Sequence, residues 1–149
     1  MTRSSGLRYT SPRALFCILA MQSLAWAVEP IPPRLYDVTT ETSMPHLEEN
    51  LRYAITHEQR CLAEEDFSTA FSVLAHPALA GCRLDRDSRT RDRISYVLTC
   101  GGGHGTTGWA LWDLGKHQIT GTLYVKLGGK NMTFQQRLTA EPVAECVRR

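Results

Sequence analysis

Histidine and methionine side chains are the first candidates for chemistry in this sequence of 149 residues. Met44 and His46 lie two positions apart and could offer a thioether and an imidazole to copper, which accepts both ligand types. His104 and His117 could meet across a hairpin, because a strand-like segment lies between them. No two histidines have the i, i+4 spacing of a helical metal site. Copper or zinc binding by these four residues is therefore the alternative hypothesis, while a packed Met44 side chain is the simpler interpretation.

Catalytic motifs are not evident in the sequence. The serines lack the Gly-x-Ser-x-Gly pattern of a nucleophile elbow. Residues 103–108, Gly-His-Gly-Thr-Thr-Gly, match the letters of a dinucleotide-binding loop. Such a loop needs a helix after it, whereas a strand-like segment follows here. We therefore expect no cofactor and no enzymatic activity, and an enzyme of unrecognised type is the remaining alternative.

Aromatic residues on neighbouring predicted strands are candidates for binding an apolar ligand. They are Trp109, Trp112, Tyr124 and Phe134. They could line an apolar pocket if part of the concave face of the sheet is left uncovered, although such side chains more often form the core. Trp109 and Trp112 cannot both face one side of a regular strand. We expect one of them to be exposed and to mark a ligand or partner site.

The first 27 residues have the pattern of a secretory signal peptide. Arg3, Arg8 and Arg13 form a basic leader, followed by an apolar run and by Ala25-Trp26-Ala27. The apolar stretch of about 12 residues is too short to span a bilayer. We predict cleavage after Ala27, which leaves residues 28–149 as one β-rich domain in the periplasm or the medium. We expect no integral membrane span in that domain.

The charge of the predicted mature chain is close to zero. Removing the three leader arginines from the 17 basic residues leaves 14, against 15 acidic residues. A domain with this balance has no long-range attraction for nucleic acid, so we expect no nucleic-acid partner. Five arginines between Arg83 and Arg93 are interleaved with three aspartates. This pattern is typical of a solvated hairpin tip, with an anion or partner contact as the alternative.

Four cysteines follow the predicted cleavage site, at Cys61, Cys82, Cys100 and Cys146. An even number of cysteines in an exported chain predicts two disulfides. Cys82 and Cys100 flank two strand-like segments, so a hairpin centred near Arg91 places them opposite each other. That pairing leaves Cys61 with Cys146. A zinc site or a redox dithiol would need closely spaced cysteine pairs, which the sequence lacks.

Alternating apolar and polar residues predict most of the secondary structure. Strand-like segments are followed by short glycine turns, a pattern typical of an antiparallel sheet. Over Leu62–Leu74, apolar residues recur at helical spacing and acidic residues suit a first turn, which predicts one short helix. The sequence therefore predicts a mainly β fold. It would be a curved antiparallel meander or a partly closed barrel of about seven strands, with one short helix and two disulfides.

Several of these segments together resemble a known family. They are Val-Thr-Thr-Glu-Thr-Ser-Met-Pro at 38–45, Cys-Leu-Ala-Glu-Glu-Asp at 61–66, the hairpin between two cysteines, and Gly-Lys-His-Gln-Ile-Thr-Gly-Thr at 115–122. With the final cysteine, their order is similar to that of the secreted bacterial domain of unknown function 3617 (DUF3617) family. The resemblance covers about Pro33 to Cys146. It implies an exported, β-rich, disulfide-bonded domain and assigns no catalytic residue.

The main functional hypothesis from the sequence is a non-enzymatic, exported binding or accessory protein. Its partner would be a small apolar ligand or a periplasmic protein held against the concave face of the sheet. The aromatic strands and the lack of catalytic motifs favour this hypothesis over the metal-binding alternative.

Overall fold

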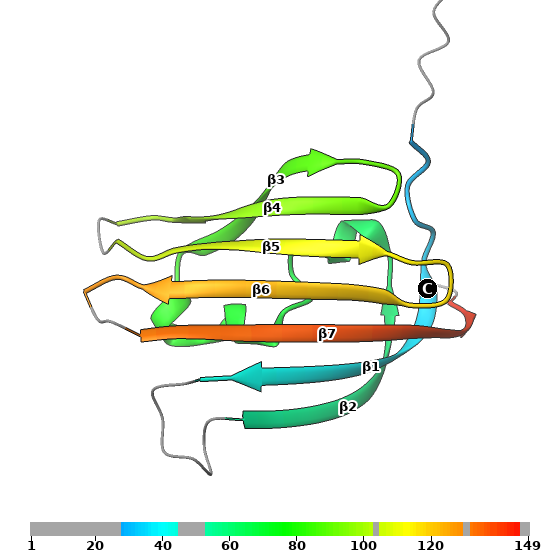
Figure 1. The fold of residues 1–149 in the computed structure, drawn as a ribbon, viewed down its shortest axis with the longest axis horizontal. Helices are drawn as coiled ribbons and strands as arrows, with labels where there is room; N and C mark the ends of the chain where they lie inside the picture. The colour runs from blue at the N-terminus through cyan, green and yellow to red at the C-terminus, as the bar shows by residue number, and fades with distance from the viewer. Residues whose placement is uncertain (1–27, 45–52, 103–104, 130–131, 147–149) are drawn as a thin grey trace, which may run out of the picture.

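The alternation of apolar side chains builds a single antiparallel sheet, shown in Figure 1. The computed structural model describes residues 28–44, 53–102, 105–129 and 132–146. Within them the strands are β1 (Arg34–Ser43), β2 (Tyr53–Leu62), β3 (Cys82–Arg89), β4 (Arg93–Cys100), β5 (Thr107–Leu114), β6 (Ile119–Leu127) and β7 (Met132–Glu145). Each strand hydrogen-bonds to its neighbours in antiparallel orientation.

The strand order, β2-β1-β7-β6-β5-β4-β3, combines a meander with an added hairpin. Strands β3 to β7 follow one another across the sheet, and the β1–β2 hairpin attaches to the outer side of β7 (Figure 1). The order does not return on itself, so β2 and β3 are the edges of an open sheet. The prediction of a mainly β, antiparallel fold of about seven strands is confirmed, and the sheet is open rather than partly closed into a barrel.

One face of the sheet is covered by the segment between β2 and β3. This segment forms three short 3-10 turns, η1 (Glu64–Asp66), η2 (Ser72–Ala75) and η3 (Pro77–Leu79). The core lies between these turns and the inward side chains of the strands. Its largest fully buried side chains are Trp112, Phe67, Phe71, Leu62, Leu79, Ile94, Leu123, Leu138, Val38 and Val125.

The short helix expected over Leu62–Leu74 is wrong. Leu62 ends β2, and the described residues contain 3-10 turns and no α-helix. The indole N–H of Trp112 donates to the carbonyl of Phe67 at 3.2 Å. In an α-helix that carbonyl would accept from the N–H of Phe71, but Phe71 is extended, with φ −77° and ψ 112°. Packing against Trp112 therefore overrides the local helical pattern.

Trp112 is the contact point between the two layers. Its ring stacks on Phe67, with centroids 4.3 Å apart and planes 15° apart, and it also contacts Phe71 at 5.3 Å. On the adjacent strand, Gly121 is the register partner of Trp112. A Cβ atom on Gly121 would lie 2.8 Å from three ring atoms of Trp112. The absence of a side chain at Gly121 therefore makes room for the ring.

Two disulfides join the pairs predicted from the sequence. Cys82 and Cys100 are register partners in the β3–β4 hairpin, and their sulfurs are bonded. Cys61 bonds to Cys146 across a sequence separation of 85 residues. Because β1 lies between β2 and β7, this second disulfide passes over the end of β1 and links the strands on both sides of it.

Among the described residues, no helix is long and apolar enough to cross a membrane. The predicted signal peptide, residues 1–27, lies outside the described residues.

Adding one methyl group at Gly121 should destabilise the fold. The Gly121→Ala side chain would force the Trp112 ring to shift, and such overpacking costs about 1–3 kcal/mol. Gly101→Ala is the matched control, because its Cβ would meet only a backbone oxygen at 3.8 Å. Urea unfolding followed by circular dichroism measures both changes. An equal loss of stability in the two variants would contradict the contact described here.

The longer disulfide loop should contribute more stability than the shorter one. In the chain-entropy model, closing 85 residues gives about 4.5 kcal/mol and closing 18 residues gives about 3 kcal/mol. We expect the Cys61→Ser/Cys146→Ser double variant to unfold at lower urea concentration than the Cys82→Ser/Cys100→Ser double variant. The opposite order would show that the length of the loop closed in the unfolded chain does not determine how much stability each disulfide contributes.

Candidate ligand-binding pocket

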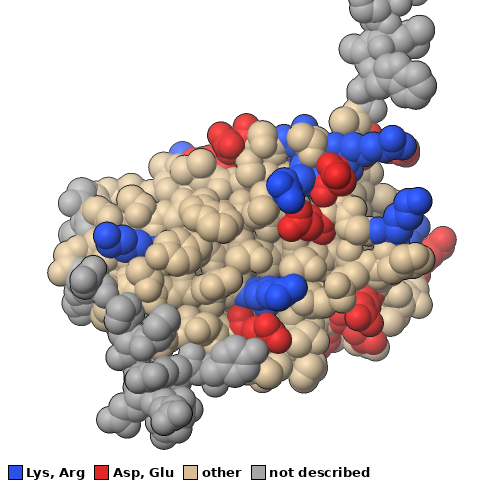
Figure 2. Space-filling model, in the orientation of Figure 1, with Lys and Arg blue, Asp and Glu red and all other residues tan. Residues whose placement is uncertain are grey.

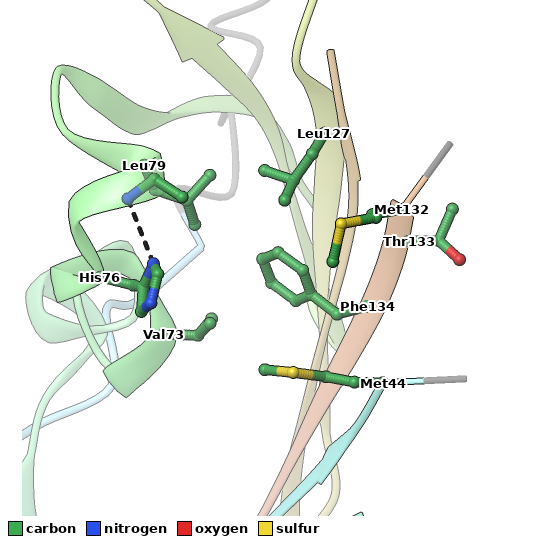
Figure 3. Close-up of a pocket in the computed structure, with 9 residues that line it drawn as sticks. Met44, Val73, His76, Leu79, Leu127, Met132, Thr133 and Phe134 are labelled. Carbon is green, nitrogen blue, oxygen red and sulfur yellow. Dashed lines mark hydrogen bonds between the residues drawn. The ribbon is translucent and has the colours of Figure 1, made fainter. Parts of the chain in front are cut away.

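An apolar pocket opens between the sheet and the covering turns, at the end where β6 turns into β7. Its volume is about 180 Å³. Figure 3 shows side chains from the turns facing side chains from the sheet across a gap, while the Thr133 side chain points away from it. The lining residues are Met44, Val73, His76, Ala78, Leu79, Leu127, Met132, Thr133 and Phe134. Most of this lining is hydrocarbon or thioether, so the pocket favours apolar ligands.

The sheet register determines which side chains form one wall of the pocket. Leu127 is paired with Met132 at the β6–β7 turn, and Val125 is paired with Phe134 two positions further along β7. Residues two apart on a strand share a face, so Met132 and Phe134 both point toward the covering turns. Met44 follows the last residue of β1 and borders the same wall (Figure 3).

Short-range hydrogen bonds shape the opposite wall. Pro77 begins η3, and the Nδ1 atom of His76 accepts a hydrogen bond from the Ala78 amide at 3.1 Å. The Leu79 amide donates to the His76 carbonyl at 2.9 Å. These bonds hold the turn so that Leu79, which is 1% exposed, points inward.

A buried glutamine ties this wall to the sheet. Gln136 is on the inner face of β7 and is 2% exposed. Its Oε1 atom accepts from the Val73 amide at 3.3 Å, and its Nε2 atom donates to Thr42 at 2.9 Å and to Ser72 at 3.1 Å. A buried amide side chain whose donors and acceptor are all hydrogen-bonded is held in one position. Gln136 therefore fixes η2 relative to β7 beside the pocket.

The chemistry available in the pocket is limited. His76 is the only titratable side chain among the nine lining residues. Met44, Met132 and His76 together have the ligand types of a soft metal site. However, Nδ1 of His76 accepts the Ala78 amide, so in the neutral ring the proton is on Nε2 and leaves no free lone pair there. The arrangement therefore supports apolar binding better than metal coordination.

The structure does not bring the four predicted aromatic site residues together. Trp112 is 0% exposed in the core, whereas Trp109 is 47% exposed on the outer face of the sheet. Tyr124 is the register partner of Trp109, and their rings are stacked with centroids 6.1 Å apart. Phe134 lies on the inner face and lines the pocket. Trp109 is thus the exposed tryptophan, and only Phe134 belongs to the apolar pocket.

The predicted metal ligands are also separated. Met44 lines the apolar pocket, whereas His117 is exposed in the β5–β6 turn at the opposite end of β6. The nine residues of β6 span roughly 27 Å between these ends. His46 and His104 lie outside the described residues. In the part of the chain that is described, no group of three or more His, Cys, Asp or Glu side chains could hold a metal ion.

Most of the pocket lining could not be predicted from the sequence. Val73, His76 and Leu79 come from the segment that was expected to be a helix or the loop after it. Leu127 and Met132 flank the β6–β7 turn and were assigned only to alternating strands. The alternation placed Met132 on the same face as Phe134, so one wall was accessible from the sequence. The other wall depends on how the turns dock.

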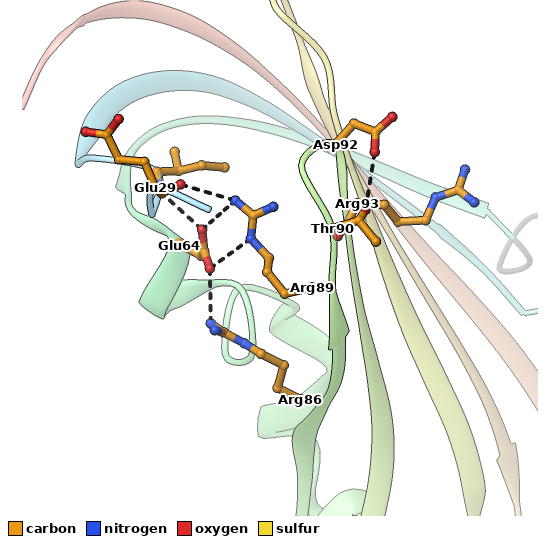
Figure 4. Close-up of polar contacts among 8 residues, drawn as sticks. Glu29, Glu64, Arg86, Arg89, Thr90, Asp92 and Arg93 are labelled. Atoms are coloured by element: carbon orange, nitrogen blue, oxygen red, sulfur yellow. Dashed lines mark hydrogen bonds and ion pairs between the residues drawn. The ribbon is translucent and has the colours of Figure 1, made fainter. Parts of the chain in front are cut away.

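The opposite end of the covering layer is closed by a charged cluster, shown in Figure 4. Glu64 is 6% exposed and accepts hydrogen bonds from Nε and Nη2 of Arg89 at 3.2 and 3.1 Å. It also accepts from the Ile31 amide at 3.1 Å and lies 3.4 Å from Nη2 of Arg86. The cluster thus joins the first turn, strand β3 and the segment before β1.

These contacts change the acidity of Glu64. Burial acts to raise the pKa of its carboxyl group. The hydrogen bonds from Arg89 and from the Ile31 amide act in the opposite direction, as do the charges of Arg89 and Arg86. Together they outweigh burial and hold the pKa of Glu64 below its ordinary value. The carboxylate is therefore ionised at neutral pH.

Comparison with protein-family models, with curated proteins and with solved structures finds no match to this chain.

Removing the Glu64 charge should destabilise the protein in a pH-dependent way. A carboxyl group with a lowered folded-state pKa stabilises the fold above its ordinary pKa of 4.5, and this stabilisation is lost as the pH falls. Glu64→Gln leaves Arg89 without its buried partner, which costs about 3 kcal/mol at pH 7. The difference from the wild type should shrink as the pH falls below 4.5 toward the lowered folded-state pKa of Glu64.

Glu58→Gln is the control for this experiment. Glu58 pairs with Arg60 at 3.1 Å, but its side chain is 51% exposed, so its removal should cost less than about 1 kcal/mol. Urea midpoints across the pH range measure both variants. A Glu64→Gln difference that stays constant with pH would contradict the role of the ionised carboxylate.

Proposed function

We propose that residues 28–149 form an exported, non-enzymatic binding domain that holds a small apolar ligand in the pocket between β6–β7 and η2–η3. The observation that carries this proposal is the open apolar cavity of about 180 Å³ at one end of an otherwise packed core. A cavity of about 150 Å³ lined by apolar side chains can hold benzene. The ligand class is therefore a single-ring compound or the end of an alkyl chain.

The lining supports binding rather than catalysis. Burial of an apolar group in the pocket gains about 25 cal/mol for each Å² removed from water. Met44 and Met132 have unbranched, flexible side chains that can adjust to ligands of different shape. The lining offers no carboxylate, thiol or second imidazole that could act with His76 as an acid–base pair. Selectivity would therefore come from shape and hydrophobicity.

We also propose export to the periplasm and membership of the DUF3617 family. The basic leader, the apolar run and the Ala25-Trp26-Ala27 segment support export. Two disulfides are compatible with an oxidising compartment outside the cytoplasm. The family proposal rests on the order of the matching sequence segments and adds no site residue to the binding proposal.

Methionine methyl groups provide a direct test of ligand binding. Met44 and Met132 are the only methionines in residues 28–149, and both line the pocket. In protein labelled with [methyl-13C]methionine, titration with toluene or n-hexanol should shift both methyl signals. Met1 and Met21 serve as internal references if the leader is retained. No shift of either pocket signal at saturating probe would overturn the proposal.

Filling the pocket should abolish the response. Ala78 is an exposed residue that lines the pocket, so Ala78→Phe places a ring at its entrance. Ala75→Phe is the matched control, because Ala75 is exposed in η2 and does not line the pocket. We expect about a tenfold loss of probe affinity in the first variant and none in the second. Equal affinity in both variants would place the probe elsewhere.

A further inference from the structure

A second pocket lies at the opposite end of the sheet from the apolar pocket. Its volume is about 240 Å³. The segment before β1, the β3–β4 tip and the β5–β6 turn form its walls, and residues from β1 and β7 complete it. Figure 2 shows that charged side chains gather around this end of the sheet.

The charged side chains that line this pocket are mostly basic. They are Arg34, Arg89, Arg91 and Lys116, against the single carboxylate of Glu29. Other arginines of the β3–β4 hairpin are paired with acids, as in the Arg83–Asp85 and Arg93–Asp113 pairs at 2.9 Å. In contrast, Arg34, Arg91 and Lys116 have no ion-pair partner within 4 Å among the described residues. The pocket therefore has a surplus of positive charge that the chain leaves uncompensated.

Arg89 adds an unsatisfied donor in the same pocket. Its Nε and Nη2 atoms bind Glu64, and Nη2 also lies 3.4 Å from the Glu29 carbonyl. The third nitrogen, Nη1, is buried and has no hydrogen-bond partner. In Figure 4 this nitrogen points away from Glu64. A buried donor without an acceptor is energetically unfavourable, and more so when it is charged.

We propose that this pocket binds a small oxyanion, such as a carboxylate or a phosphate group. An anionic oxygen would supply the missing acceptor for Arg89, and the uncompensated charges of Arg91 and Lys116 would surround the rest of the anion. Hydrogen bonds between guanidinium groups and oxyanions are shorter and stronger than those between neutral groups. Glu29, Ile31 and Pro32, from the segment before β1, line the pocket together with Arg89.

Two features of the pocket favour an anion over other ligands. An apolar ligand would leave the Arg89 donor without an acceptor. It would also bury little apolar surface against a lining rich in arginine and lysine side chains. A cation would be repelled by the four basic side chains. The proposed site is separate from the apolar pocket, because the two lie at opposite ends of β6, so each can be tested without the other.

Titration with inorganic phosphate and with citrate at constant ionic strength, balanced with chloride, tests the proposal. We expect the amide signals of Gly115 and Lys116 in the NMR spectrum to shift and to saturate. The signal of Gly129, in the turn at the other end of β6, should stay fixed. Saturating anion should also raise the Tm, because a ligand that binds only the folded state stabilises it. Phosphate and citrate present the same kind of anionic oxygen. Their relative affinities show whether the site prefers a phosphate group or a carboxylate.

Variants at exposed positions separate specific binding from general charge effects. Arg91→Gln/Lys116→Gln removes two uncompensated charges from the pocket, and we expect about a tenfold weaker affinity for the anion. Arg83→Gln/Lys126→Gln removes the same charge from exposed positions outside the pocket and should leave the affinity unchanged. Equal affinity in both double variants, or no saturable shift in the wild type at about 10 mM anion, would overturn the proposal.

Discussion

The stack of Phe67 on Trp112 sets the separation between the sheet and the turns that cover it. The indole N–H binds the Phe67 carbonyl, and Gly121 on the next strand leaves space for the ring. Trp112, Phe67 and Phe71 are all fully buried, so side chains pack tightly around this contact. Toward the two ends, the same separation must be filled by other groups. The apolar pocket occurs at one end, where this filling is incomplete.

The two ends of the layer are held by different kinds of interaction. At one end Gln136, a neutral side chain, connects the turns to β7 and leaves an apolar wall beside it. At the other end the ionised Glu64 connects the turns to Arg89 and to the segment before β1. The neutral Gln136 is compatible with a hydrophobic cavity beside it. The charged Glu64 instead requires arginine partners, and one nitrogen of Arg89 has no acceptor. The apolar pocket lies beside the neutral Gln136, and the basic pocket includes Arg89, the partner of the ionised Glu64.

The sheet could be predicted from the sequence because each strand is encoded locally. The period-two pattern in residues 119–127 identifies the inward side chains of β6, and the hairpin geometry around Arg91 identifies the Cys82–Cys100 pair. The covering segment could not be predicted in the same way. Phe67 and Phe71 have helical spacing, and only the distant Trp112 diverts their backbone into 3-10 turns. The apolar pocket depends on that docking, so much of its lining could not be predicted from the sequence.

The position of β1 between β2 and β7 has a consequence for the order of folding. β1 pairs with a strand roughly a hundred residues later in the chain, and contacts of such long range are slow to form. The β3–β7 meander can assemble from neighbouring segments, whereas the β1–β2 hairpin must wait for β7 before it joins the sheet. The Cys61–Cys146 bond connects the strands on either side of β1, so native pairing of these cysteines requires that late docking step. Formation of this bond therefore reports that the last segment of the sheet has joined.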